Sequence, residues 1–248
     1  APNFREFVRE GVAAEGLIPS YPSKTFPNHY TLVTGLVPGH HGIVDNSFYD
    51  VKSQRRYGMS DTSAVRDAYF YKGVPIWNVA QAKGMKSACL FWVGSEAAIG
   101  GQRPDYYLTY DESMPERARV DQVMEWFRLP KDKRPNFVSL YFEVVDTQTH
   151  DFGTKSPEAA AAVEKADAIL GYLTDQLSEL PFEVNVVVVS DHGMLELPKK
   201  KETYLIVNDI LGDPASGYTV ISSGTQVHIY GDITDSLYTT LKKSANHY

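Results

Sequence analysis

Residues 184–194 read VNVVVVSDHGM, an apolar run that ends in an aspartate, a histidine and a glycine. A nearly unbroken apolar run of this kind favours a strand buried on both faces, as in a parallel sheet covered by helices. We therefore expect a strand over 184–189, with Asp191 and His192 at its carboxyl end. Gly193 lets the backbone turn sharply at that point.

Outward from this run, short β-branched or aromatic stretches alternate with helical patterns, and no linker or internal repeat separates them. This alternation favours an α/β layered fold with a central, largely parallel sheet and helices on both faces. Ser156, Pro157 and Glu158 form a strong helix start, because a capping residue precedes a proline and an acid. The further strands that we expect are 86–92, 136–142, 203–207 and 226–230, and the helices are 4–12, 75–83, 115–127, 156–180 and 235–244.

Composition limits the class of protein. The 248 residues carry 24 basic and 31 acidic side chains, a net charge of −7, which argues against a general nucleic-acid binder because phosphate backbones are bound by Lys and Arg. The single cysteine, Cys89, excludes an intrachain disulfide and is expected to be a small buried hydrophobe. We expect no transmembrane segment and no signal peptide in this chain, since neither hydrophobic pattern is present.

Two strand ends carry side chains that suit a metal ion. Asp191 and His192 follow the first strand, and Asp146 and His150 follow the strand 136–142. Asp146 and His150 share one face if the segment is helical, because residues four apart are neighbours on a helix. Each pair alone could be a capping Asp beside an unrelated His. Since ligands of open α/β sheets bind beyond the carboxyl ends of the strands, the two pairs together favour a shared metal centre.

Residues 21–35 read YPSKTFPNHYTLVTG and contain a second helix start. Thr25 is placed to be the N-cap, Pro27 lies in the first turn and Gly35 marks the stop. An ordinary helix N-cap with no chemical role is enough to explain this pattern. A helix N-terminus also offers free N–H groups to an anion, and a hydroxyl beside metal ions can serve as a nucleophile. His29 is expected to pack or hydrogen-bond locally, and His40 and His41 to lie in an exposed turn.

The chain resembles the nucleotide pyrophosphatase/phosphodiesterase family of the alkaline phosphatase superfamily. The resemblance rests on an ordered set of motifs that runs through most of the chain, and any one of them alone is modest. They are YPSKTFPNHY at 21–30, HGIVDN at 41–46, PIW at 75–77, GSE at 94–96 and VSDHGM at 189–194. The resemblance implies a three-layer alkaline-phosphatase-like fold and a single phosphodiesterase domain over 1–248.

The resemblance also implies a chemistry and its residues. Thr25 matches the family's nucleophile, which also binds one zinc ion together with the residues that Asp191 and His192 match. Asp146 and His150 match ligands of a second zinc ion. Asn46 matches an asparagine that donates a hydrogen bond to a phosphoryl oxygen. Two aromatic positions that sandwich a nucleobase in nucleotide-cleaving members match Phe26 and, less closely, Tyr110.

The implied activity is zinc-dependent hydrolysis of phosphodiester or pyrophosphate bonds, in nucleotides or other small phosphodiesters and not in a nucleic-acid duplex, through a phosphorylated threonine. The alternatives are a phosphomonoesterase or phosphonate hydrolase of the same superfamily, or a non-catalytic binding domain. Family members carry a zinc-binding aspartate before, and a zinc-binding histidine after, the region that matches here. We therefore expect association with further parts of the same domain. Many members of the family are periplasmic or extracellular, so the resemblance implies such a location.

Overall fold

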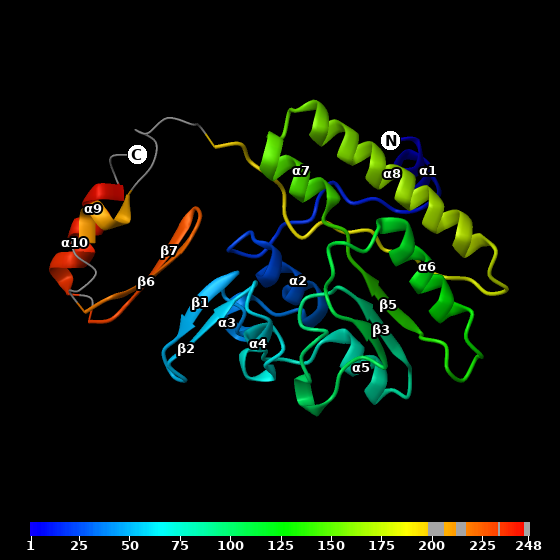
Figure 1. Cartoon of the computed structure of the whole chain (residues 1–248), viewed down its shortest axis with the longest axis horizontal. Coiled ribbons are helices and arrows are strands. Elements are labelled where there is room, and N and C mark those ends of the chain that lie inside the picture. Colours follow the sequence, from blue (N-terminus) through cyan, green and yellow to red (C-terminus); the bar gives the residue numbers. More distant parts are fainter. Residues whose placement is uncertain (198–205, 212–216, 233, 246–248) are drawn as a thin grey trace.

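The centre of the molecule is a parallel three-stranded sheet with the order β4-β3-β5. The computed structural model describes residues 1–197, 206–211, 217–232 and 234–245. Strand β3 (Ser87–Leu90) lies between β4 (Tyr106–Leu108) and β5 (Phe137–Leu140), and both pairings are parallel. Each strand is followed along the chain by a loop or helix at the carboxyl edge, where α/β sheets carry their sites (Figure 1).

Helices cover both faces of this sheet. Cys89 belongs to an apolar cluster with Tyr30 of α2 (Thr25–Thr34) and Trp77 of α5 (Ile76–Ala82). Its neighbours Ala88 and Leu90 belong to a second cluster, with side chains of α6 (Glu116–Phe127) and α8 (Pro157–Ser178). Successive side chains of a strand point to opposite faces, so β3 has a core on each side. The predicted α/β fold class and the buried state of Cys89 are confirmed.

The remaining elements surround this centre. The N-terminal helix α1 packs along α8, where the buried carboxylate of Asp167 accepts hydrogen bonds from the backbone amides of Asn3 and Phe4. The other elements are α1 (Pro2–Glu10), α3 (Pro38–His41), β1 (Ser47–Asp50), β2 (Arg55–Gly58), α4 (Thr62–Val65), a 3₁₀ turn at Ala68–Phe70, a second at Ile99–Gly101, α7 (Val144–Phe152), α9 (Val207–Leu211), β6 (Thr219–Ser223), β7 (Gln226–Tyr230) and α10 (Asp235–Ala245).

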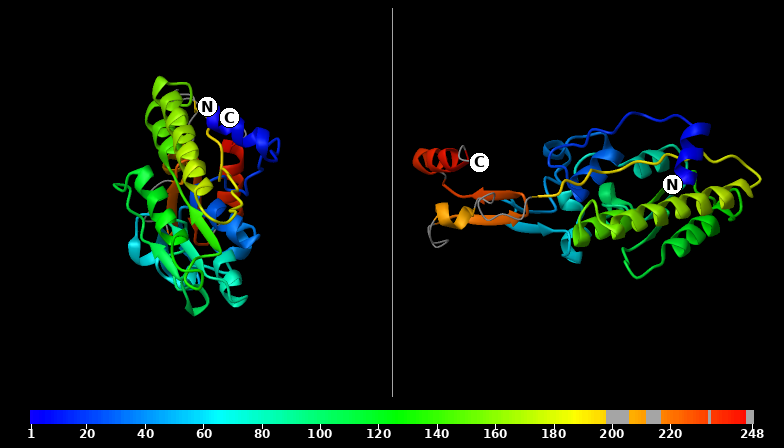
Figure 2. Two further views of the ribbon diagram at one scale, coloured as in Figure 1. Left: turned by 90° about the vertical axis from the view of Figure 1, so that its right-hand side faces the viewer. Right: turned by 90° about the horizontal axis from the view of Figure 1, so that it is seen from above.

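Two antiparallel hairpins, β1-β2 and β6-β7, lie apart from the parallel sheet. The β6-β7 hairpin sits beside β1, and together with α9 and α10 it extends away from α6 and α8 (Figures 1 and 2). The hairpin therefore joins the C-terminal part of the chain to the region that follows α2. None of the described helices is long and apolar enough to cross a bilayer.

Most of the predicted elements are confirmed, with ends shifted by a few residues. The predicted helices correspond to α1, α5, α6, α8 and α10, and the predicted strands 86–92, 136–142 and 226–230 correspond to β3, β5 and β7. The start of α8 follows its sequence signal, since the Ser156 hydroxyl accepts the amide of Ala159 at 3.0 Å.

The strand expected over 184–189 is absent from the described structure. This segment has no regular secondary structure and pairs with no described strand, and Val187 is 82% exposed. An apolar run indicates that the side chains avoid water, but a strand also needs a partner edge for its backbone. Of the weaker strand 203–207, residues 203–205 lie outside the described residues, whereas Val207 begins α9 and is therefore helical.

Candidate active site

The first turn of α2 presents the Thr25 hydroxyl at the carboxyl edge of the sheet. Lys24, and not Thr25, is the N-cap, because Lys24 has extended backbone angles and Thr25 is already helical. The prediction of a Thr25 N-cap is therefore wrong by one residue, while the stop at Gly35 is confirmed by its left-handed conformation. As a result, the Thr25 side chain does not cap its own helix and its oxygen is available to other groups.

The Thr25 hydroxyl lies against the imidazole of His192. The distance between Thr25 Oγ1 and His192 Nε2 is 3.2 Å. His192 Nδ1 lies 2.9 Å from the carbonyl oxygen of Gly193, which fixes the proton on Nδ1 because a carbonyl can only accept. Nε2 is therefore the ring nitrogen that faces Thr25. This arrangement suits either a hydrogen bond from the threonine hydroxyl or a shared metal ion.

The Asp191 carboxylate contacts the imidazoles of both His192 and His29. Its Oδ2 lies 3.3 Å from His192 Nε2 and 3.3 Å from His29 Nδ1. Burial alone would raise the pKa of Asp191, but the hydrogen bond and charge of His29, together with the charge of His192 and its amide, hold that pKa below the usual value. Asp191 is therefore a charged carboxylate beside the Thr25 hydroxyl.

His29 was predicted to pack or hydrogen-bond locally, and both contacts are present. Its Nδ1 lies 2.9 Å from the Thr25 carbonyl oxygen, one helical turn back, and its ring meets Trp92 and Tyr141 edge to face. Its additional contact with Asp191 was not predicted. The spacing of four residues from Thr25 signals the first contact, but nothing local signals the second, since Asp191 is distant in the sequence.

Asn46 lies next to the same helix start. Its side-chain oxygen Oδ1 accepts the backbone amide of Phe26 at 2.9 Å. This bond uses the acceptor end of the Asn46 amide and leaves Nδ2 as the donor end. The predicted role of Asn46, donation to a phosphoryl oxygen, fits this orientation. The backbone N–H of Phe26 already donates its hydrogen bond to Asn46.

The second predicted pair lies on α7, which directly follows β5. The expected helical spacing is confirmed, and His150 Nε2 lies 3.7 Å from Asp146 Oδ2. Burial raises the pKa of Tyr141, and the charges of Asp191, Glu143 and Asp146 raise it further. Both predicted carboxylate ligands are therefore within electrostatic reach of one phenol. No contact joins Asp146 or His150 to Thr25 within the described part of the chain.

The predicted metal ligands do not form a group of three in the described structure. Among residues 1–197 and the other described ranges, no three His, Cys, Asp or Glu side chains are arranged to hold one ion. The donor types nevertheless fit zinc, which takes imidazole nitrogen and carboxylate oxygen. His192 Nε2 lies 3.2 Å from Thr25 Oγ1 and 3.3 Å from Asp191 Oδ2, so it contacts both of the other predicted ligand atoms.

The two predicted base-stacking rings have different surroundings. Phe26 is half-buried and meets Tyr57 edge to face, with ring centroids 6.2 Å apart. Tyr110 is 48% exposed, and its ring meets Phe91 at 5.4 Å. The amide of Tyr110 donates to a carboxylate oxygen of Glu96 at 2.9 Å, which fixes the loop after β4. In the described structure, Phe26 and Tyr110 make no ring contact with each other.

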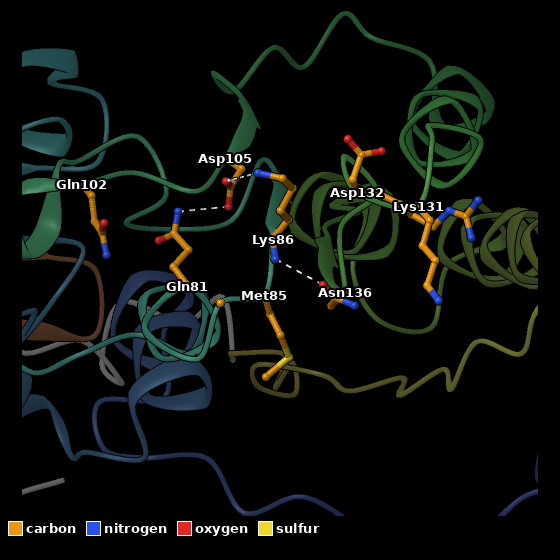
Figure 3. A pocket seen from close by; sticks show the side chains of 10 residues that line it. Gln81, Met85, Lys86, Gln102, Asp105, Lys131, Asp132 and Asn136 are labelled. Atoms are coloured by element: carbon orange, nitrogen blue, oxygen red, sulfur yellow. Dashed lines mark hydrogen bonds and ion pairs between the residues drawn. The ribbon is translucent and has the colours of Figure 1, made fainter.

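A polar cavity of about 420 Å³ lies at the opposite, amino edge of the sheet (Figure 3). Asp105 pairs with Lys86 at 3.2 Å and accepts from Gln81 at 3.1 Å, so its charge is satisfied. Ligands of open α/β sheets bind at the carboxyl edge, and we therefore assign the candidate site to the Thr25 region and not to this cavity.

Comparisons with known proteins identify the family. A profile described as "Type I phosphodiesterase / nucleotide pyrophosphatase" matches residues 1–248. The chain belongs to this family. The family includes human ectonucleotide pyrophosphatase/phosphodiesterase family member 1, to which the chain is 42% identical over 205 residues, 82% of this chain and 22% of that protein. It is 41% identical over 206 residues to a venom phosphodiesterase of Crotalus durissus collilineatus, 82% of this chain and 25% of that protein.

Solved structures of family members share the fold. Murine ectonucleotide pyrophosphatase/phosphodiesterase 5 matches with a TM-score of 0.88 and 33% identity, over 97% of this chain and 64% of that chain. A second structure of the murine protein, described as an inactive threonine-to-alanine variant in complex with AMP, matches with a TM-score of 0.88 and 32% identity, over 97% of this chain and 64% of that chain. The chain spans about a quarter of the length of the curated relatives that it matches.

Proposed function

We propose that the protein containing this chain is a zinc-dependent nucleotide pyrophosphatase/phosphodiesterase with Thr25 as its nucleophile. The observation that carries the proposal is the position of Thr25 Oγ1, at the start of α2 and 3.2 Å from His192 Nε2. Membership of the phosphodiesterase family supports the reaction class. The AMP complex of a related murine protein supports a nucleotide as substrate. We further propose that residues 1–248 belong to a single domain.

The hydroxyl of Thr25 is oriented for attack on phosphorus. Its Oγ1 lies 3.2 Å from His192 Nε2, and the Asp191 carboxylate lies 3.3 Å from the same nitrogen. Attack forms the bond between Thr25 Oγ1 and phosphorus and breaks the bond from phosphorus to the leaving oxygen. Water then cleaves the Thr25–phosphate ester and restores the hydroxyl. The donor end of Asn46 is placed to bind a phosphoryl oxygen throughout, as preorganised donors do at developing charge.

Zinc would be held by Thr25, Asp191 and His192 at one position and by Asp146 and His150 at the other. When bound, two such ions supply positive charge that favours the deprotonated hydroxyl and offsets the charge of the phosphodiester. His192 Nε2, the ring nitrogen that faces Thr25, is the atom that would bind zinc. Relatives named as ecto- and venom enzymes support a periplasmic or extracellular site of action.

The experiment compares hydrolysis of bis(p-nitrophenyl) phosphate with that of p-nitrophenyl phosphate, in added zinc and in chelator. We expect a zinc-dependent preference for the diester, abolished by Thr25→Ala and partly retained by Thr25→Ser. Thr34→Ala is the matched control, because Thr34 lies on the same helix and its hydroxyl donates only to the Tyr30 carbonyl within α2. It should keep full activity.

Each other outcome points to one of the alternatives. Preference for the monoester would indicate a phosphomonoesterase on the same scaffold. Zinc binding without turnover of either ester would indicate a non-catalytic domain. Equal activity in wild type and Thr25→Ala would overturn the assignment of the nucleophile while leaving the reaction class intact.

A further inference from the structure

Asp45 is a fully buried carboxylate with no role in the chemistry described above. Its side chain is 0% exposed, and it directly precedes Asn46. Oδ1 accepts from Lys24 Nζ at 3.1 Å and from the Ser223 hydroxyl at 2.6 Å, while Oδ2 lies 2.8 Å from His228 Nε2. The amide of Asn46 also donates to Oδ1, at 2.6 Å. We call Asp45 and these donor side chains the Asp45 hub.

The hub joins the two segments that carry the proposed chemistry. Lys24 is the N-cap of α2 and directly precedes Thr25, whereas Asp45 directly precedes Asn46. Between these segments, the Asn46 side chain accepts the amide of Phe26 at 2.9 Å. The Lys24–Asp45 ion pair and this hydrogen bond thus form two cross-links, one on each side of Thr25. Together they fix where the Thr25 hydroxyl lies relative to the Asn46 amide.

The β6-β7 hairpin completes the hub from the other end of the chain. Ser223 ends β6, and His228 lies in β7. Lys24 Nζ also donates to the Ser223 hydroxyl, at 2.7 Å, and to the Ser223 carbonyl. A second attachment holds the hairpin to β1, where the Tyr49 amide donates to the Tyr230 hydroxyl at 3.1 Å. The hairpin lies directly beside β1 in Figure 1, so its placement agrees with these contacts.

The charge of Asp45 is kept despite its burial. Burial alone would raise its pKa, but hydrogen bonds from Ser223, His228 and Lys24, together with the Lys24 charge, hold that pKa below the usual value. A buried ionised carboxylate is tolerated only when it is paired and hydrogen-bonded, as it is here. Removing the charge therefore leaves Lys24 without its counter-charge and loosens the cross-link next to Thr25.

We propose that Asp45 is a positioning residue for phosphoryl transfer, acting through Lys24 on Thr25 and through its own backbone on Asn46, and that the β6-β7 hairpin completes this function through Ser223 and His228. The proposal rests on the proposed function, since it assigns Asp45 to the geometry of that same reaction. Small displacements of a nucleophile are costly, because attack requires close and aligned atoms. Loss of the hub should therefore lower kcat far more than it changes KM.

The test uses two independent ways of removing the hub. Asp45→Asn keeps the shape of the side chain but loses its charge, and the double variant Ser223→Ala/His228→Ala removes two donors from the hairpin without changing the buried residue. Asp167→Asn is the matched control, because Asp167 is also a buried carboxylate that accepts several hydrogen bonds, but it lies between α1 and α8. It should lower stability without changing kcat.

With bis(p-nitrophenyl) phosphate as the probe, we expect Asp45→Asn to lower kcat by roughly 10- to 100-fold, with a much smaller change in KM. The double variant Ser223→Ala/His228→Ala should also lower kcat. Hydrogen exchange gives a readout without turnover, since the amides of Phe26 and Asn46 should exchange faster in both variants than in Asp167→Asn.

An active wild type whose Asp45→Asn and hairpin variants both keep kcat and amide protection would overturn the proposal. A wild type that cleaves no diester would instead overturn the proposed function, so the two failures are distinguishable. If Asp45→Asn does not fold, the hairpin variant decides alone, because its two residues are only part-buried. A kcat loss of equal size in Asp167→Asn would also count against the positioning role, since it would trace the loss to general destabilisation.

Discussion

Arg119 and Glu143 form a two-point ion pair beneath the candidate site. The distances are 2.6 Å from Nη1 to Oε2 and 2.7 Å from Nη2 to Oε1. Arg119 belongs to α6 and is 1% exposed, while Glu143 is the residue immediately before α7. The pair therefore ties the start of the helix that carries Asp146 and His150 to the helical layer behind the sheet.

This pair predicts an asymmetric response to substitution. Glu143→Ala leaves a buried guanidinium without its counter-charge and should lower the free energy of unfolding by about 3 to 5 kcal/mol. Arg119→Met should cost less, because a long apolar side chain can pack between the rings of Phe91 and Phe142 and the part-exposed Glu143 can be hydrated. Urea unfolding of the two variants gives both values.

The control is the more exposed ion pair between Lys165 of α8 and Glu116 of α6. Lys165→Met should change the free energy of unfolding by less than about 1 kcal/mol, since exposed pairs contribute little. A larger loss for Arg119→Met than for Glu143→Ala would contradict the view that the uncompensated buried charge decides the cost.

The sequence predicted the elements whose determinants are local. The cap at Ser156 and the four-residue spacing of Asp146 and His150 each depend on neighbours within one helical turn, and both are present in the structure. The run 184–189 failed as a strand because pairing depends on a distant edge that an apolar pattern does not specify. Strands β1, β2, β4 and β6 were not predicted; β1 (SFYD), β2 (RRYG) and β4 (YYL) contain no β-branched residue, the residue type that marks a strand in the sequence.

The candidate site shows the same division. The resemblance assigned Thr25, Asp191 and His192 to one site, and the structure places Thr25 and His192 in contact although they are 167 residues apart. The partners of Asp45 could not be predicted at all, because His228 lies 183 residues away and carries no motif that points to Asp45. Local patterns thus identified reactive side chains, whereas the residues that position them emerged only from the tertiary structure.

His41 predicts a pH dependence of stability. It was expected to be exposed in a turn, but it is fully buried, while its neighbour His40 is exposed. Burial lowers the pKa of His41 to about 4, although hydrogen bonds with backbone groups of Pro27 and His41 offset part of the effect. The neutral ring is also the one that fits, because Nδ1 accepts the amide of Ile43 at 3.2 Å.

The sign follows from proton uptake. Between the unfolded pKa of about 6.5 and the folded value of about 4, the unfolded chain binds a proton that the folded chain does not. The free energy of unfolding should therefore fall as the pH drops through this window, by up to about 3 kcal/mol from this residue. Urea unfolding followed by tryptophan fluorescence across this range measures the slope. His41→Gln should flatten it and His40→Gln should leave it unchanged; equal slopes in wild type and His41→Gln would refute the assignment.

Tyr110 predicts a substrate-dependent effect on KM. Its exposed ring is supported at one edge by Phe91, and its backbone is held by Glu96, so a free ring face is presented by a fixed loop. A nucleobase stacked on such a ring gains about 1 to 3 kcal/mol, which corresponds to roughly 5- to 150-fold in affinity. Tyr110→Ala should therefore raise KM for thymidine 5′-monophosphate p-nitrophenyl ester, a diester with a base. It should have little effect with methyl p-nitrophenyl phosphate, which lacks one, and Tyr110→Phe should behave as wild type because it keeps the ring. An equal rise in KM for both substrates would show that Tyr110 supports the phosphate site and does not bind the base.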